Sequence, residues 1–200
     1  MKPSLPPLKP RHGILYTYLI VKPSDLHARP DFNSIDLGLR NRFDMKLARL
    51  KGVGEGILIE AIRTEKNPSG DRYRFKKSAA SPESLYTYKA AVRAVDKVID
   101  ADTLWADVDF GFRIWGERKF RFRGINTAEM KDGGEKARRY VIRVLSRVAF
   151  VVLKVSGRDK FGRPLIDLFY LEGEPDPQKV ADNGKFLNQE LIERGLAKRV

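Results

Sequence analysis

The chain has 200 residues, enough for one larger domain or two small ones, and 42% of them are hydrophobic, which is enough apolar material for a core. Lys and Arg number 39 against 26 acidic residues, and the net charge of +13 favours polyanionic partners, nucleic acid first and an anionic membrane surface second. The lack of cysteine excludes disulfides and thiolate metal sites. No apolar run approaches the length of a membrane span, and the N-terminus lacks the apolar region of a signal peptide, so we expect a soluble cytoplasmic protein with no membrane partner.

Strand-like segments fill the first half of the chain. Residues 1–12 are rich in proline and are predicted to form a flexible tail. The segments ILYTYLIV, SIDLGL, FDMKLARLKGV and GILIEAIRT are candidate strands, KNPSGD is a turn, and RYRFKK alternates like another strand. We therefore predict a β-rich segment over residues 13–84, which ends in the boundary SAASPES.

An internal repeat relates the two halves. The motif LYTY occurs at 15–18 and 85–88, IDLGLR echoes VDFGFR, and RLKGV echoes RFRGI, all in the same order and at similar spacing. The first half is interpreted as a shortened, degenerate copy of the strands of the second half. The alternative is chance similarity between basic β-strands.

A second interpretation competes over LARLKGVGEGILIEAI. This stretch resembles the helix–hairpin–helix element, in which a Gly-hydrophobic-Gly hairpin offers backbone N–H groups to a DNA phosphate. Its β-branched residues and the parallel with RFRGI favour strands. Both interpretations place the segment near nucleic acid.

The second half alternates between strands and helices. KFRFRGI has a period of two, with Phe120 and Phe122 on one face and Arg121 and Arg123 on the other. GEKARRYVIRVLSRV has helical spacing, AFVVLKVS and LIDLFYL are strands around the turn GRDKFGRP, and FLNQELIERGLA is a helix that Gly195 ends. GEPDPQKVADNGK is predicted to be a loop. Five strands, with a helix after the third and another at the end, predict a mainly β protein with helices and a closed five-stranded barrel of the OB type.

Four motifs together resemble the staphylococcal nuclease (thermonuclease-like) family. VIDADTL, FRFRGINTAE, DKFGRPL and FLNQELIERGLAK occur in the family's order, and the resemblance covers residues 85–200. It implies a nuclease barrel in this part of the chain. It also implies hydrolysis of DNA or RNA phosphodiester bonds with Ca²⁺ as cofactor, in which water attacks phosphorus and the 5′-oxygen leaves.

The resemblance also assigns roles to single residues. Asp102, Asn126 and Thr127 match the family's calcium ligands, the last through its main-chain carbonyl. Glu129 matches the acidic residue that acts on water, and Arg121 and Arg163 match the two arginines that bind the scissile phosphate. Lys160 would meet a terminal phosphate, and Phe161 takes the place of a nucleotide-contacting tyrosine. A planar guanidinium suits bidentate phosphate binding, and Ca²⁺ prefers oxygen ligands, so the residue types fit these roles.

The sequence departs from the family pattern at the metal site. Asn126 replaces a carboxylate, Ala128 replaces a turn proline, and Ala101 replaces a glycine. The loss of one negative charge weakens the expected affinity for calcium. Two functions therefore remain open: a calcium-dependent nuclease, which the retained Arg121, Glu129 and Arg163 favour, and a nucleic-acid-binding barrel without catalysis.

Overall fold

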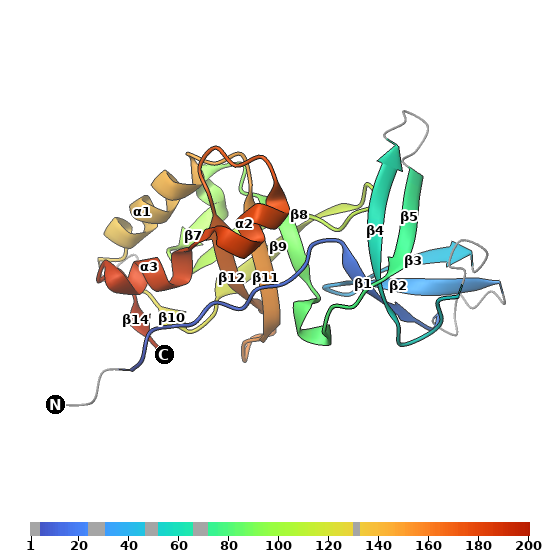
Figure 1. Ribbon diagram of the computed structural model, residues 1–200. Helices are drawn as coiled ribbons and strands as arrows, with labels where there is room; N and C mark the ends of the chain where they lie inside the picture. The colour runs from blue at the N-terminus through green and yellow to red at the C-terminus, as the bar shows by residue number, and fades with distance from the viewer. Residues whose placement is uncertain (1–4, 24–30, 47–51, 66–71, 130–132) are drawn as a thin grey trace.

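The computed structural model describes residues 5–23, 31–46, 52–65, 72–129 and 133–200. These residues form a closed barrel that carries three helices and an open half-barrel beside it (Figure 1). The mainly β architecture with helices and the closed five-stranded barrel confirm the coarser part of the predicted fold class.

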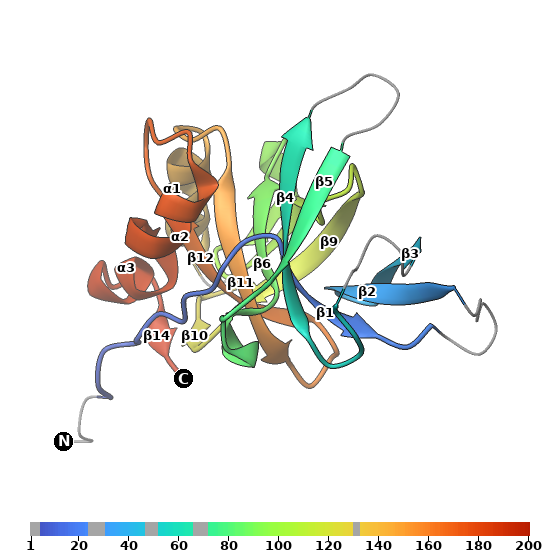
Figure 2. The ribbon, with the colours of Figure 1, turned by 45° about the vertical axis from the view of Figure 1, so that its right-hand side comes forward.

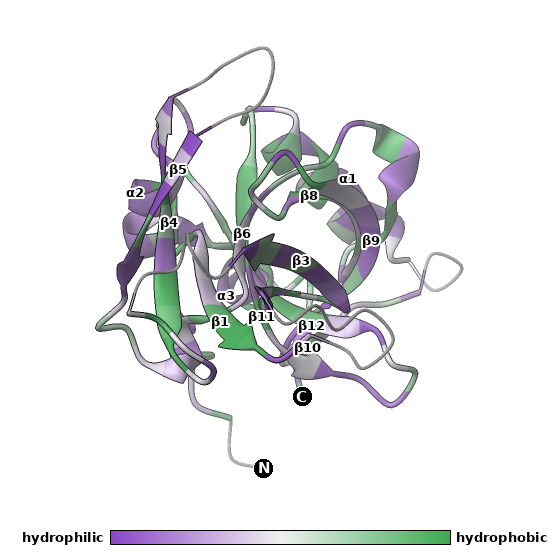
Figure 3. Cartoon of the chain, turned by 90° about the vertical axis from the view of Figure 1, so that its right-hand side faces the viewer, coloured by the Kyte–Doolittle hydropathy of each residue, from purple (hydrophilic) through white to green (hydrophobic). Residues whose placement is uncertain are grey.

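The half-barrel is a five-stranded antiparallel sheet from the first half of the chain, in the order β3-β2-β1-β4-β5. The strands are β1 (Thr17–Val21), β2 (Phe32–Gly38), β3 (Asn41–Lys46), β4 (Leu58–Glu65) and β5 (Arg72–Lys77). Hydrophilic residues gather on the outer strands β3 and β5, whereas the central β1 is hydrophobic (Figure 3). Part of the predicted strand at 43–53, together with the turn at 66–71, lies outside the described residues.

The barrel consists of β6, β8, β9, β12 and β11, and the parallel pairing of β9 with β12 closes it. The barrel strands are β6 (Thr87–Ala91), β8 (Thr103–Asp109), β9 (Trp115–Phe122), β11 (Val151–Arg158) and β12 (Pro164–Tyr170). The short strands β7 (Val98–Asp100) and β13 (Lys185–Phe186) extend this sheet, whereas β10 (Ile125–Asn126) and β14 (Lys198–Arg199) form a separate two-stranded sheet. The helices are α1 (Glu135–Leu145), α2 (Pro177–Asn183) and α3 (Leu187–Glu193), and short 3₁₀ turns span Pro82–Ser84 and Val95–Lys97.

The two sheets have the same strand order and the same register. Ile20 pairs with Ile35 in the half-barrel, as Ala90 pairs with Val108 in the barrel. The backbone N–H of Ala61 donates to the carbonyl of Tyr16 at 3.0 Å. At the equivalent place in the barrel, the N–H of Val155 donates to the carbonyl of Tyr86 at 3.0 Å. The half-barrel therefore repeats five strands of the barrel but lacks a pairing between its outer strands β3 and β5 among the described residues.

An aromatic ring from the barrel half packs among the aromatic residues of the half-barrel. Phe112, from the turn between β8 and β9, stacks on Phe43 at 4.7 Å between ring centroids and lies 4.8 Å from Tyr73. One hydrophobic cluster also joins the two sheets, since it includes buried Ile20 and Ile59 as well as Phe110. The halves thus share one core.

Residues 5–15 form a strap along the barrel (Figures 1 and 2). Leu8 is 2% exposed. Its N–H donates to Gln189 at 2.8 Å, and the N–H of Arg11 donates to Asp167 at 2.7 Å. His12 stacks on Phe169 at 5.1 Å. The prediction of a flexible tail over residues 1–12 therefore does not hold for its described part. The buried side chain of Leu8 and the backbone N–H groups of Leu8 and Arg11 attach this proline-rich segment to the barrel.

Two further predictions needed correction. The segment GEPDPQKVADNGK contains helix α2, in which Asp176 caps the N-terminus by accepting from Gln178 N at 2.8 Å and Pro177 takes the first turn. The helix–hairpin–helix alternative is wrong for its second helix, because residues 58–65 form strand β4. Residues 47–51, which belong to its first helix, lie outside the described part of the chain. No helix among the described residues is long and apolar enough to cross a membrane.

Candidate active site

Strand pairing brings Asp102 and Arg121 together. Asp102 lies in the turn between β7 and β8, and Arg121 is the penultimate residue of β9, where it pairs with Thr103. The backbone N–H of Phe122 donates to the Asp102 carbonyl at 2.8 Å, which holds the turn against the end of β9. Because Phe120 and Phe122 point into the barrel, the side chain between them faces outward.

Arg121 bridges two of the predicted metal ligands. Its Nη1 donates to Asp102 Oδ1 at 2.8 Å, and its Nη2 donates to Asn126 Oδ1 at 2.7 Å. The second carboxylate oxygen of Asp102 accepts from the backbone N–H of Thr127 at 2.8 Å. Asp102 is 2% exposed, so its charge is buried and is balanced by the guanidinium. Four of the eight predicted site residues thus form one connected cluster.

The hairpin between β11 and β12 carries three more of the predicted residues. Asp159 accepts from the N–H groups of Phe161 and Arg163 at 2.9 and 2.8 Å, and from Arg163 Nε at 2.6 Å. Burial opposes ionisation of Asp159, but these hydrogen bonds prevail and lower the pKa of its carboxyl group. The Arg163 guanidinium is therefore held at a fixed place on the hairpin.

Two cations lie near the ring of Phe161 at the tip of this hairpin. Its ring is 72% exposed, with Lys160 Nζ 5.0 Å and the Arg163 guanidinium carbon 5.3 Å from its centroid. An exposed ring with cations beside it is suited to stack on a nucleic-acid base while the cations meet phosphates.

The β9–β12 pairing relates the hairpin to the Arg121 cluster. Arg121 pairs with Leu165, which follows Arg163 by two residues on β12. The hairpin therefore starts from the strand that neighbours the cluster. Arg163 itself forms its ion pair with Asp159, at 2.6 Å.

Glu129 follows β10 and is exposed. Its carbonyl accepts from the N–H of Gly134 at 2.9 Å, at the entrance of α1. A Cβ at Gly134 would come within 2.2 Å of the Ala128 carbonyl, so only glycine allows this close return of the chain. Glu129 is thus three residues beyond Asn126, in the loop between the Arg121 cluster and the helix.

Two side-chain oxygens of the cluster are of the type that hard cations take. Asp102 and Asn126 each direct an oxygen at the same cationic group, the guanidinium of Arg121, and oxygen donors of this kind are what Ca²⁺ takes. Only one of them is charged. Within the described ranges, no three His, Asp or Glu side chains gather in a group that could hold a metal.

No protein-family model matches the chain, and no curated protein matches it. The resemblance to thermonuclease-like proteins therefore rests on the four sequence motifs.

Sequence reasoning missed the residues that hold the predicted ones in place. Asp159 holds the hairpin through its side chain. The sequence signal for this role is its position two residues before Phe161, because an Asp side chain commonly accepts from the backbone N–H two residues later in a turn. Asp167, 0% exposed, binds Arg123 through both carboxylate oxygens at 2.7 and 2.8 Å. Nothing in the alternation of LIDLFYL distinguishes that buried charge from a surface one.

Proposed function

We propose that this protein hydrolyses phosphodiester bonds of nucleic acid, DNA or RNA, at the outer face of the barrel where β8, β9 and β10 meet. The observation that carries this proposal is the convergence of Asp102, Arg121, Asn126 and Thr127, from three separate segments, on one cluster with direct hydrogen bonds. Such convergence is expected if the motifs belong to one nuclease-like site of an OB-type barrel, and it is not expected of unrelated turns and strands.

The proposed chemistry needs positive charge where the phosphate gains negative charge. Arg121 and Arg163 would each present a guanidinium fork to the phosphate oxygens, and these contacts strengthen as water adds to phosphorus. Asp102 and Asp159 act as positioning residues, because each fixes one guanidinium by an ion pair, at 2.8 and 2.6 Å. Glu129 would accept the proton of the attacking water.

A calcium ion would be held by Asp102, Asn126 and the Thr127 carbonyl, and when bound it would supply Lewis-acid polarisation of the phosphate. The side-chain oxygens of Asp102 and Asn126 now accept from Arg121, and Asp102 also accepts from the Thr127 N–H. A cation at this place would therefore compete with the guanidinium. We expect calcium affinity to be low for that reason.

One observation favours the second candidate function, a nucleic-acid-binding barrel without catalysis. Arg121 already satisfies both Asp102 and Asn126, and this closed arrangement needs no metal. A protein that only binds would use Lys160, Phe161 and Arg163 as its contact surface and would retain the Arg121 cluster to support the fold.

The direct test is cleavage of an end-labelled single-stranded oligonucleotide by the full chain, with millimolar calcium and with EDTA. The nuclease proposal predicts products with 3′-phosphate ends that form only with calcium. Binding without any cleavage at saturating calcium would establish the second candidate instead.

A further inference from the structure

A groove between the half-barrel and the barrel presents unbalanced positive charge. It has a volume of about 370 Å³ and lies between the β2–β3 turn and the β11–β12 hairpin. Arg40 and Arg42 line it from the half-barrel, and Arg158 lines it from the barrel. Gly157, Pro164, Tyr86 and Val155 also line the barrel side.

The only carboxylate of this groove among its lining residues is already satisfied. Asp36 accepts from the hydroxyl of Tyr86 at 2.9 Å and from the N–H of Gly38 at 2.9 Å. Arg40 and Arg42 are exposed, and within the described part of the chain neither forms an ion pair. Their charges therefore remain available to an anion.

The larger cavity of the molecule has a different character. It measures about 970 Å³ and is lined by four carboxylates, those of Glu60, Asp109, Asp176 and Asp182. They offset its cations Arg63, Lys89 and Arg113. Mixed charge of this kind does not select a polyanion, whereas the groove at Arg40 and Arg42 does.

The β11–β12 hairpin contributes both to this groove and to the candidate active site. Arg158 pairs with Pro164 across the hairpin, and its Nη1 donates to the carbonyl of Gly162 at 2.8 Å. Arg163 and the exposed ring of Phe161 belong to the same hairpin. A strand that stacks a base on Phe161 and places a phosphate at Arg163 would therefore meet Arg158 next, and then the half-barrel.

We propose that this groove binds the backbone of a single-stranded nucleic acid, so that Arg40 and Arg42 of the half-barrel hold the strand that enters the candidate active site. The inference rests on the proposed function for the direction of the strand. Phe161 favours an unpaired strand because bases in a duplex are already stacked. The half-barrel, which repeats the barrel strands, thus acts as the part that extends the substrate site.

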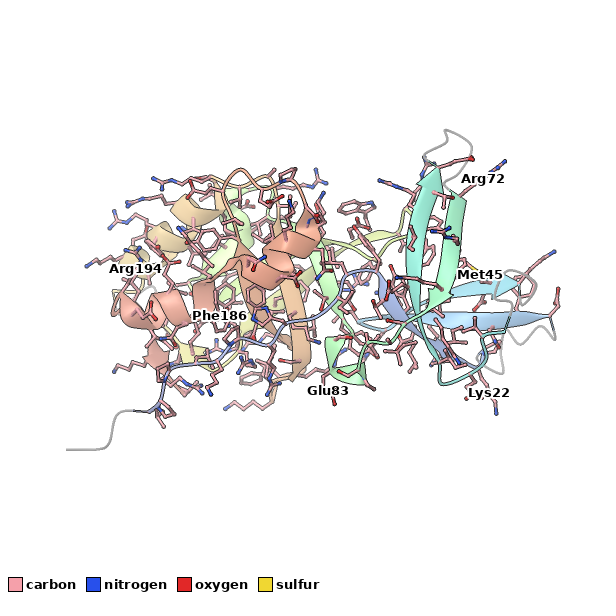
Figure 4. The ribbon with its side chains drawn as sticks, in the orientation of Figure 1. Lys22, Met45, Arg72, Glu83, Phe186 and Arg194 are labelled. Carbon is pink, nitrogen blue, oxygen red and sulfur yellow. The ribbon has the colours of Figure 1, made fainter. Side chains whose placement is uncertain are left out.

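The chain offers a matched control on the opposite edge of the same sheet. Arg72 and Arg74 lie on β5, and β3 and β5 are the two outer strands. Figure 4 labels Arg72 at the outer end of β5, away from the barrel. Arg72→Gln with Arg74→Gln removes the same charge as Arg40→Gln with Arg42→Gln but leaves the groove intact.

The experiment measures the Kd of an oligothymidylate of about twelve nucleotides, a length within the range that one OB-type barrel covers. Titrations of the full-length wild type and both double variants use EDTA, so cleavage does not enter, at salt concentrations from about 50 to about 200 mM. Each lost phosphate contact lowers the slope of log K against log salt by about 0.7 for a single strand. We expect the Arg40/Arg42 variant to lose about 1.4 from that slope and the Arg72/Arg74 variant to keep it.

The outcomes separate the groove from the nuclease activity. An unchanged slope in the Arg40/Arg42 variant, with wild-type binding intact, would overturn the groove and leave the proposed function standing. An equal loss of slope in both variants would show that only the net charge matters, and this would also overturn the groove as a binding site. A duplex that binds as tightly as the single strand would overturn the choice of an unpaired strand. The expected loss of slope supports the groove even if the wild type cleaves nothing.

Discussion

Tyr18 and Tyr88 occupy equivalent positions in the two sheets, and each donates its hydroxyl to the other half of the molecule. Tyr18 donates to the carbonyl of Phe110 at 2.9 Å, and Tyr88 donates to the carbonyl of Leu37 at 2.8 Å. Both tyrosines are 4% exposed, so each bond is shielded from water. This reciprocal exchange makes the half-barrel and the barrel depend on each other for stability.

The exchange requires glycine at positions 38 and 111, because a Cβ at Gly38 would lie 2.0 Å from the hydroxyl of Tyr88 and one at Gly111 would meet that of Tyr18. This leads to a stability prediction, with Gly173 as the control. At Gly111 (φ 77°) a Cβ would lie 2.2 Å from the hydroxyl of Tyr18, whereas at Gly173 (φ 77°) nothing lies within 4 Å. Gly173→Ala should cost only the left-handed backbone conformation, about 1–2 kcal/mol. Gly111→Ala should cost the same plus the displaced hydrogen bond, about 1–3 kcal/mol more. Equal losses by urea denaturation would show that the close packing at Gly111 has no energetic role.

Lys154 gives a prediction for the pH dependence of stability. Its side chain is buried and donates to the carbonyl of Leu85, and burial lowers its pKa to about 8. Between this pKa and the ordinary value of 10.5, the unfolded chain binds more protons than the folded one. The free energy of unfolding should therefore rise from pH 8 toward pH 10, by at most about 1.4 kcal/mol per pH unit.

The comparison that isolates this contribution is Lys154→Met against Lys179→Met, which removes an exposed lysine of α2. Urea denaturation of each variant and the wild type at three values between pH 7.5 and pH 9.5 measures the slope. We expect the rise to persist in the Lys179 variant and to disappear in the Lys154 variant. A rise that survives in Lys154→Met would assign the pH dependence to other groups.

Asn126 leads to a prediction about the metal. Replacing Asn126 by Asp adds a second carboxylate beside Asp102, where Asn126 now accepts from Arg121 at 2.7 Å. Asn126→Asp should tighten calcium binding, measured by titration calorimetry, and raise cleavage at limiting calcium. Asp102→Asn should abolish the calcium signal. Unchanged calcium affinity in both variants would show that these residues are not metal ligands.

Glu129 separates catalysis from binding. Glu129→Gln keeps the size of the side chain and removes the charge that accepts the proton of water, so kcat should fall by about 10²–10⁴. Affinity for the oligonucleotide should stay equal or rise, because a negative charge near the phosphate is lost. Glu135→Gln, in the first turn of α1, removes the same charge from the next helix and should leave kcat unchanged. Equal kcat values in the two variants would exclude Glu129 as the base.

The sequence predicted the parts of the fold that local patterns determine. KFRFRGI and LIDLFYL alternate because one face of each strand is buried, and both strands were found in place. The strap was missed, since the contacts of Leu8 and Arg11 come from residues about 150 to 180 positions away. Helix α2 was missed although Asp176 and Pro177 are a local signal for its first turn. The motifs located the Arg121 cluster, but the position of its guanidinium between Asp102 and Asn126 depends on strand register. Hydrophobic alternation alone does not specify this register across separate strands.

The most direct test of the proposed nuclease is the kinetics of Arg163→Lys on one short oligonucleotide at fixed salt and calcium, with Lys160→Gln as the neighbouring control. Both residues lie on the hairpin that Asp159 holds, and neither contributes a buried apolar side chain. Lysine at position 163 keeps the positive charge but cannot form the bidentate hydrogen bonds of a guanidinium group. We therefore predict a nearly unchanged Kd and a kcat lower by about 10²–10³. Lys160→Gln should show the reverse, a weaker Kd with kcat preserved. If both changes appear only in Kd, or if the wild type has no measurable kcat, the proposed nuclease activity is contradicted and the protein is a nucleic-acid-binding barrel.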